Sequence, residues 1–287
     1  MTDTQTLVMG AVAYAPKVVT IWDGFKEYFA KRNFSFDYVL YSNYERQVEA
    51  MFSGSIHLAW NSPLAWIRAE RMAHAANVPV RAMAMRDSDC DLTSVIVVRN
   101  EAPIKSLADL NGKKVAVGAV DSPQATLIPL DYLRSQGLKP GTDFTVQRFD
   151  VLGGKHGDHI GGERDAARAL MTGQVDAACM IDGNHLLFIS EGTLPQGQTR
   201  VLAQTPKYDH CNFSVGPSAP SDLIECFRTL LFGMSYADPE VRPLFDLEGL
   251  KAWKEGRVSG YQLLDHAVAE AGFYDARGNI TVTDYRY

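Results

Sequence analysis

Residues 50–60 read AMFSGSIHLAW, and residues 169–179 read ALMTGQVDAAC. In each segment an apolar helical pattern stops at a glycine, Gly54 or Gly173, and a short apolar run follows. Glycine tolerates the left-handed backbone with which helices commonly end, so both segments predict a helix end followed by a buried strand. Two copies of this helix–glycine–strand repeat in a chain of 287 residues indicate two lobes of similar build. Ligands favour the cleft between two such lobes.

Outward from the two repeats, strand-like and helix-like patterns alternate along the chain. Helical patterns cover residues 18–31, 43–51, 121–136 and 163–171, and strand patterns cover 7–13, 36–41, 94–99, 114–118 and 144–149. This alternation predicts an α/β fold with mostly parallel sheets. We expect Pro129 to kink its helix, because proline has no N–H to donate. The end of the chain, 274–287, is expected to be irregular.

The composition excludes several classes of function. The net charge is −6 and no basic run occurs, so nucleic acid is not the expected main partner. The apolar runs are far shorter than the 18 or so residues of a membrane span, and we expect no membrane insertion. The start, MTDTQ, has no basic region followed by an apolar one, so we expect a cytoplasmic chain, or a periplasmic one if a leader had been removed. The four cysteines show no close paired spacing, and no disulfide framework is expected.

Residues 94–99, SVIVVR, and 103–116, PIKSLADLNGKKVA, carry a resemblance to a known family. With them the chain resembles the phosphonate/phosphite substrate-binding proteins of ABC importers, over about residues 7–245. The resemblance implies a two-lobed, type II periplasmic-binding-protein-like fold with two crossover segments. Lobe one would be residues 1–98 plus 212–287, and lobe two residues 99–211. It also implies closure of the lobes around a ligand by a hinge motion, and an ABC permease, or a sensor, as partner.

Polar residues at two predicted helix starts are candidate ligand contacts. Ser122, Gln124 and Thr126 open the helix 121–136, and Asn61 and Ser62 precede a second helix that begins at a proline. A helix N-terminus offers unpaired N–H groups and the positive end of a dipole, both of which suit an anion. An ordinary helix cap is the alternative at each place. The family has a denser run of hydroxyl residues at the first of these starts.

Further candidates follow strand ends, where ligands collect on α/β sheets. Tyr14, Tyr44 and Thr93 are in such positions. The resemblance implies that Asp182 contacts a substrate amine. It also implies that Arg164 stands where a ligand-contacting histidine is usual. Arg164 would clamp a carboxylate or phosphate, or it would be a solvated charge on a helix.

The loop 153–162, GGKHGDHIGG, looks like an insertion relative to the family. Its His156, Asp158 and His159 offer the imidazole and carboxylate ligands that suit Zn²⁺ or another first-row divalent metal. His185 and His210 are expected to approach the same cleft, as ligand contacts. A flexible surface loop, a lid over the ligand and a catalytic loop are the alternatives to a metal site.

Two functions follow from these features. The first is binding of a small anionic or zwitterionic molecule, phosphonate- or carboxylate-like, for transport or sensing. The second is a cytoplasmic enzyme on the same scaffold, a metal-dependent decarboxylase or lyase acting on a small carboxylic acid, because a fold does not by itself fix a function.

Overall fold

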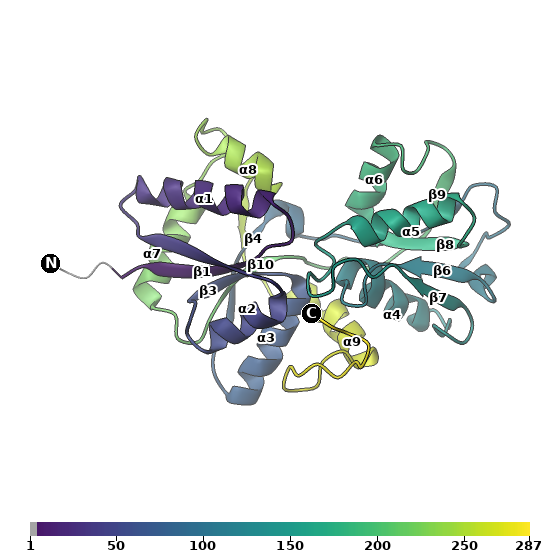
Figure 1. Ribbon diagram of the computed structural model, residues 1–287, viewed down its shortest axis with the longest axis horizontal. Helices are drawn as coiled ribbons and strands as arrows, with labels where there is room; N and C mark the ends of the chain where they lie inside the picture. Colours follow the sequence, from purple (N-terminus) through teal and green to yellow (C-terminus); the bar gives the residue numbers. More distant parts are fainter. Residues whose placement is uncertain (1–4) are drawn as a thin grey trace. The chain divides into compact units, whose positions relative to one another are not determined.

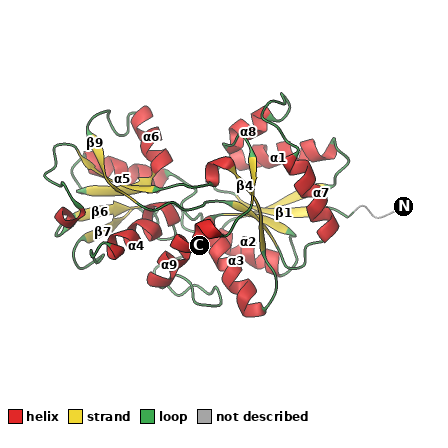
Figure 2. Ribbon diagram, turned by 180° about the vertical axis from the view of Figure 1, so that it is seen from behind, coloured by secondary structure: helices red, strands yellow, loops and turns green. Residues whose placement is uncertain are grey.

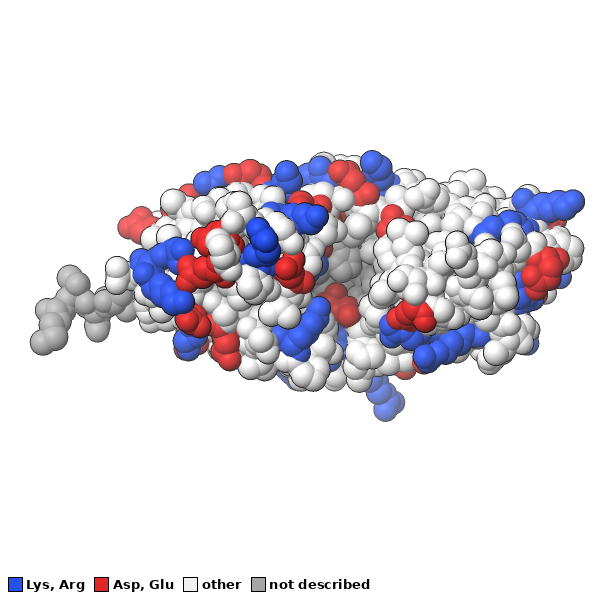
Figure 3. All heavy atoms as spheres, turned by 90° about the horizontal axis from the view of Figure 1, so that it is seen from above, with Lys and Arg blue, Asp and Glu red and all other residues white. Residues whose placement is uncertain are grey.

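The computed structural model describes residues 5–287, which form two compact units, each with its own sheet (Figure 1). Unit 1 contains the described residues up to 90 together with 209–261 and 276–279, and unit 2 contains 91–208, 262–275 and 280–287. No helix within residues 5–287 is long and apolar enough to cross a membrane. On the face shown in Figure 3, basic and acidic side chains are interspersed over both units.

Unit 1 is a six-stranded sheet, in the order β11-β4-β10-β3-β1-β2, with helices on both faces. Helices α1, α7 and α8 cover one face, and α2 and α3 cover the other (Figure 1). Its elements are β1 (Leu7–Val12), α1 (Lys17–Ala30), β2 (Phe36–Tyr41), α2 (Tyr44–Phe52), β3 (Leu58–Asn61), α3 (Pro63–Ala76), β4 (Arg81–Arg86), η1 (Asp87–Asp89), β10 (Asn212–Val215), α7 (Ser221–Phe232), α8 (Arg242–Glu248), β11 (Trp253–Glu255) and η4 (Ser259–Tyr261).

An aromatic core fills the space between this sheet and α1, α7 and α8. The ring of Phe213 lies 4.8 Å from that of Trp60 and 5.4 Å from those of Phe227 and Trp253, in tilted and edge-on arrangements. Such aromatic pairs contribute about 0.5–1.5 kcal/mol each beyond the area that they bury. This core holds β3 and β10 in place, and both strands have one end among the candidate site residues.

Unit 2 has a five-stranded sheet in the order β7-β6-β8-β5-β9. Helices α5 and α6 pack on one face, and α4 and the turn η2 on the other. Its elements are β5 (Ser94–Arg99), η2 (Leu107–Leu110), β6 (Lys114–Val117), the single π-helical turn η3 (Pro123–Leu127), α4 (Ile128–Ser135), β7 (Thr145–Arg148), α5 (Gly161–Met171), β8 (Ala177–Ile181), α6 (Asp182–Ser190), β9 (Thr199–Gln204) and α9 (Gln262–Glu270).

The predicted α/β class is confirmed, and both sheets are mixed. In unit 1, β1 pairs in parallel with β2 and β3, whereas β10 is antiparallel to β3 and β4. In unit 2, β6 is parallel to β7 and β8, whereas β5 is antiparallel to β8 and β9. Strands β5 and β10 each follow a passage of the chain from one unit to the other, so they enter their sheets from the opposite end, and β11 is also antiparallel to its neighbour β4.

The two helix–glycine–strand repeats have the same backbone geometry. Gly54 and Gly173 have φ of +77° and +75°. Ala50 O accepts the N–H of Ser55 at 3.0 Å, and Ala169 O accepts the N–H of Gln174 at 3.0 Å. One repeat lies in each unit, so the prediction from residues 50–60 and 169–179 is confirmed.

The structure differs from the sequence-based expectation in one helix and in the bounds of the two lobes. The helix expected over 121–136 is the π turn η3 followed by α4, because Pro129 has no N–H for Ala125 O, and the N–H of Gly118 donates to that carbonyl instead at 3.3 Å. The expected lobes also differ from the units. Residues 91–98, which include Thr93, were expected in lobe one but belong to unit 2, and so do α9, which packs on α4 and η3, and residues 280–287. Residues 209–211 were expected in lobe two but belong to unit 1. Nδ1 of His266 on α9 lies 2.9 Å from Oδ2 of Asp131 on α4.

Candidate functional site

The carboxyl ends of three neighbouring parallel strands gather the predicted residues of unit 1 at one edge of its sheet. Tyr14 follows β1, Tyr44 follows β2, and Asn61 ends β3. Ser62 caps α3: its Oγ accepts the N–H of Ala65 at 3.1 Å. The structure therefore brings these four candidates to the same edge, where α1, α2 and α3 begin.

Behind this edge runs a buried chain of side-chain hydrogen bonds. Gln47 Nε2 donates to Oδ1 of Asn61 at 2.8 Å, and Nδ2 of Asn61 donates to Oγ of Ser214 at 2.9 Å. The chain continues through Asn212, whose Nδ2 donates to the hydroxyl of Tyr261 at 2.9 Å. Such a network fixes the end of β3 against β10, since each buried polar group left unbonded would cost about 1–3 kcal/mol.

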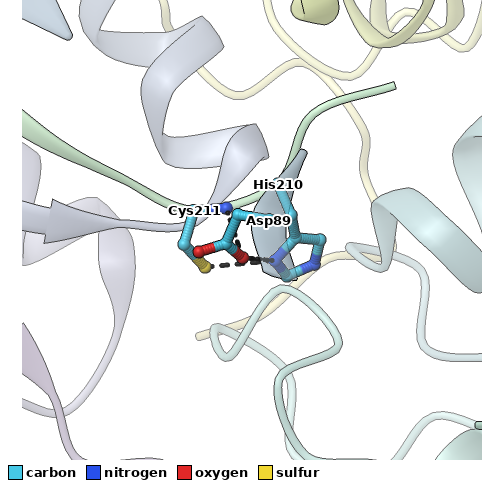
Figure 4. Close-up of side chains that lie close together, drawn as sticks. All are labelled: Asp89, His210 and Cys211. Atoms are coloured by element: carbon cyan, nitrogen blue, oxygen red, sulfur yellow. Dashed lines mark hydrogen bonds and ion pairs between the residues drawn. The ribbon is translucent and has the colours of Figure 1, made fainter. Parts of the chain in front are cut away.

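At the same edge, Asp89, His210 and Cys211 lie together (Figure 4). Arg86 binds the carboxylate of Asp89 in a bidentate manner: Nε donates to Oδ2 at 2.6 Å, and Nη2 donates to Oδ1 at 2.8 Å. His210 Nδ1 lies 3.1 Å from Sγ of Cys211 and 3.5 Å from Oδ1 of Asp89. Burial raises the pKa of Asp89, but the charge of Arg86 and the hydrogen bonds from Arg86 and His210 lower it more, to about 2.

Within residues 5–287 this trio is the group whose three potential metal-ligand atoms lie within 4.8 Å of one another. A cation bound there would lie beside the guanidinium of Arg86, which already occupies both oxygens of Asp89. Nη1 of Arg86 also donates to the carbonyl of Glu248 at 2.7 Å. We therefore interpret the trio as a buried ionic joint that ties β4 to α8 and β10. His210, predicted as a ligand contact, is part of this joint.

The corresponding edge of unit 2 collects the other predicted residues. The parallel strands β6 and β8 end just before Ser122 and Asp182, and the antiparallel strand β5 begins at that edge after Thr93. Ser122 Oγ caps η3 by accepting the N–H of Ala125 at 3.2 Å. The hydroxyl of Thr126 donates to Ala119 O at 2.7 Å, so this side chain holds the turn before η3.

Gln124 connects η3 to the Gly-rich loop and to a buried carboxyl group. Its Nε2 donates to Gly157 O at 2.9 Å and to Oε1 of Glu163 at 3.2 Å. Oε2 of Glu163 accepts the N–H of Ile181 at 3.0 Å and Nδ2 of Asn184 at 2.9 Å. Oε1 of Gln124 is buried and has no hydrogen-bond partner among the described residues.

The neighbours Thr93 and Ser94 tie Asp182 to η3. Thr93 Oγ1 donates to Oδ2 of Asp182 at 2.8 Å, and Ser94 Oγ donates to the backbone carbonyl of Gln124 at 2.5 Å. Ser94 also lies 2.8 Å from the hydroxyl of Tyr208. Burial raises the pKa of Tyr208 well above its usual range, so this hydroxyl stays protonated. The Asp182 carboxylate and the capped turn η3 are thus held by two adjacent residues of one hydrogen-bonded framework.

The Gly-rich loop is held by a carboxylate at its base. Oδ2 of Asp121 accepts the N–H of Gly154 at 2.7 Å and that of His156 at 3.1 Å. His156 has φ of +50°, a conformation uncommon outside glycine, and its side chain is fully buried. His159 Nδ1 accepts the N–H of Gly161 at 3.2 Å, which leaves its Nε2 as the atom that could bind a metal. The metal set His156, Asp158 and His159 stays a prediction.

Arg164 and His185 are the remaining candidate ligand contacts in unit 2. The guanidinium of Arg164 binds Glu191 with two bonds, from Nε at 2.8 Å and from Nη2 at 3.0 Å, and it lies 5.2 Å from the ring centroid of Phe188. Arg164 is thus paired with Glu191 in this structure, and both expectations for it, a ligand clamp and a solvated helix charge, stay predictions. Burial lowers the pKa of His185, so its imidazole is neutral, and its Nε2 is buried without a hydrogen-bond partner in the described chain.

Sequence reasoning missed three residues of these edges. Glu163 was only the first residue of the helical pattern 163–171, whereas in the structure it is buried on the same face of α5 as Gly162, Ala166 and Ala167. Ser94 entered the sequence analysis only as the start of the strand pattern 94–99, and Tyr208 was not among the candidates. The contact between Ser94 and Tyr208 spans 114 positions of sequence, and the bond between Gln124 and Glu163 spans 39, so no local pattern reveals them.

A family model described as ABC transporter, phosphonate, periplasmic substrate-binding protein matches residues 9–261. The resemblance carried by residues 94–99 and 103–116 is therefore confirmed.

Solved structures share the fold at low sequence identity. PhnD1 from Prochlorococcus marinus, in complex with methylphosphonate, is 15% identical, with a TM-score of 0.69 over 94% of this chain and 99% of that chain. A Xanthomonas citri protein bound to ATP is 14% identical, with a TM-score of 0.71 over 93% and 98%. The periplasmic aliphatic sulphonate binding protein SsuA from Escherichia coli is 20% identical, with a TM-score of 0.55 over 93% and 82%. At these identities the likeness establishes the fold.

Proposed function

We propose, from the premise that this chain belongs to the family of periplasmic phosphonate substrate-binding proteins of ABC transporters, that it binds a small phosphonate that also carries an amine. The observation that carries the proposal is the shared framework in unit 2. There Thr93 and Ser94, adjacent in the chain, hold the Asp182 carboxylate and the start of η3.

The two halves of such a ligand have different requirements. The turn that begins at Ser122 presents the N-terminal end of a helix, which suits the anionic head. The carboxyl groups of Asp121, Glu163 and Asp182 lie at the same edge, and they would repel a bare dianion. A protonated amine on the ligand offsets that repulsion, so a zwitterion fits this edge better than phosphate.

Family membership favours a binding protein over the enzyme that the sequence left open. We propose that the protein acts in the periplasm and passes its ligand to an ABC permease, with a sensor as the alternative partner. Cell fractionation of a strain that expresses the complete gene would test the compartment. Recovery of the protein in the cytoplasmic fraction alone would contradict it.

Isothermal titration of the purified protein tests the ligand class. The panel is 2-aminoethylphosphonate, methylphosphonate, inorganic phosphate, an alkyl sulfonate and a small carboxylate. We expect the aminophosphonate to bind at least tenfold more tightly than methylphosphonate, since one charge-assisted contact contributes about 1.4 kcal/mol or more. Equal affinity for the two phosphonates would contradict the role of the carboxylates, and no binding by any compound would contradict the proposal.

Asp182→Asn is expected to remove that preference. The amide keeps the shape of the side chain but loses its charge, so the affinity for 2-aminoethylphosphonate should fall about tenfold while that for methylphosphonate changes less than about threefold. Asp165→Asn on α5 is the matched control, because Asp165 pairs with Arg168 on the same helix. A loss of affinity for both phosphonates alike would show that Asp182 does not select the amine.

The metal at His156, Asp158 and His159 remains a separate proposal. Elemental analysis of untagged protein is expected to find a first-row divalent ion, and His159→Ala should lose it, because that variant removes one imidazole ligand. His74→Ala, an exposed histidine on α3, is the control. Protein purified without chelators that contains no metal would contradict the proposal.

A further inference from the structure

Residues 262–287 lie beyond the family match, which ends at 261, and most of them belong to unit 2. Helix α9 packs on α4 and η3, and both views show it beside α4 (Figures 1 and 2). After α9 the chain turns back, since the N–H of Thr281 donates to Phe273 O at 3.0 Å. We call residues 280–287 the C-terminal strap.

The C-terminal strap lies beside the turn η3. Its Val282 and Asp284 line one pocket together with Thr126 and Leu127 of η3. Asp284 forms an ion pair with Arg148 at the end of β7, with Nη1 to Oδ2 at 2.5 Å. The strap is therefore anchored at the same sheet edge at which the candidate ligand residues lie.

Tyr285 places the strap against the base of the Gly-rich loop. Its ring is buried, with its centroid 5.0 Å from that of Phe273. Its hydroxyl donates to Oδ2 of Asp121 at a distance of 3.3 Å. This is the same oxygen that accepts the N–H groups of Gly154 and His156. Tyr285 thus contacts the carboxylate that holds the loop.

A second contact joins the strap to the loop directly. A Cβ built on Gly153 would lie 2.7 Å from the backbone O of Arg286, so the strap and the loop touch at a distance that only glycine permits. From there the loop leads to Gly157, whose carbonyl accepts Nε2 of Gln124 at 2.9 Å. The contacts form an unbroken path from the strap, through Asp121 and the loop, to η3.

We propose that the C-terminal strap positions the loop 153–157 against η3, and that Tyr285 is a positioning residue for ligand binding. The ligand-binding part of this inference rests on the proposed function. The positioning of the loop does not, because it concerns contacts within unit 2 alone.

Hydrogen exchange at the loop amides tests the positioning in the full-length protein. Tyr285→Phe removes one hydroxyl and keeps the buried ring. The N–H groups of Gly154 and His156 should exchange about three- to tenfold faster in this variant, because their shared acceptor loses a partner that fixes it. Tyr287→Phe is the matched control: it removes the hydroxyl of a more exposed tyrosine at the end of the same strap and should leave the exchange unchanged.

Ligand affinity is the second readout. The affinity for 2-aminoethylphosphonate should fall about three- to tenfold in Tyr285→Phe while the melting temperature stays within a few degrees of wild type. A role limited to stability would instead lower the melting temperature and leave the affinity of the folded protein unchanged.

Gly153→Ala approaches the same contact from the loop side, because its methyl group would push Arg286 away. It should accelerate exchange at the same amides, and it decides the question if Tyr285→Phe fails to fold. Wild-type exchange rates in the folded variants would overturn the proposal. If neither phosphonate binds wild-type protein, the proposed function fails, and the exchange rates still decide whether the strap positions the loop.

Discussion

Gly157→Ala should weaken the binding of 2-aminoethylphosphonate by at least tenfold. A Cβ at this position would overlap Oγ of Ser122 and would lie 2.7 Å from Nε2 of Gln124. Ser122 cannot rotate away without giving up the N–H of Ala125 that it caps. Either the loop or the start of η3 must therefore move, and the bond from Gln124 to the loop carbonyl is lost.

Gly141→Ala is the control that separates this clash from backbone strain. Gly157 and Gly141 have φ of +76° and +78°, so an alanine costs about 1–2 kcal/mol of conformational energy at either site. Nothing lies within 4 Å of a Cβ on Gly141. Both variants should melt at lower temperature, and only Gly157→Ala should lose affinity in titration calorimetry. Equal affinities in the two variants would show that the loop is not part of the ligand site.

Asp89→Asn should lower the free energy of unfolding of unit 1 by about 3–5 kcal/mol at pH 7. The variant leaves the buried guanidinium of Arg86 without the carboxylate that it contacts through two bonds, and breaking a buried ion pair from one side has a cost of that size. All four tryptophans, at positions 22, 60, 66 and 253, belong to unit 1. Urea unfolding followed by tryptophan fluorescence therefore measures this unit separately.

The difference in free energy of unfolding between wild type and Asp89→Asn should depend on pH. The pKa of Asp89 falls from an ordinary value of 3.8 to about 2 in the folded protein. A lowered folded pKa gives stability that is present above about pH 4 and is lost as the pH falls toward 2. This pKa shift corresponds to about 2 kcal/mol. The difference in free energy of unfolding between wild type and Asp89→Asn should therefore decrease by about that amount from pH 6 to pH 2.

Asp246→Asn on α8 is the control for the ionic joint, because within residues 5–287 Asp246 accepts an exposed bond from Tyr236 and no other side-chain bond. It should change the free energy of unfolding by less than about 1 kcal/mol. If the difference in free energy of unfolding between wild type and Asp89→Asn stays constant with pH, the ionised carboxylate of Asp89 is not what stabilises the ionic joint.

The sequence predicted those features that depend on near neighbours in the chain. The glycine stops at Gly54 and Gly173 report a backbone conformation that one residue type adopts easily, and both repeats are present. The caps at Ser62 and Ser122 need only a hydroxyl three residues before an N–H, and both form. The strand ends that carry Tyr44, Asn61 and Asp182 were likewise readable from local patterns, because strands that alternate with helices end at a common edge.

Tertiary structure decided the partners of those residues. The pairing of Arg164 with Glu191 has no local signal in the sequence, because the two residues are 27 positions apart. Glu163 became a buried acceptor because α5 packs with that face against β8, and Tyr208 reached Ser94 because β5 and β9 are paired. The end of the chain, expected to be irregular, is tied through Tyr285 to Asp121. Local conformational preference is set by a few neighbouring residues. The contacts listed here join side chains that are far apart in the sequence, and only the folded units bring them within hydrogen-bond distance.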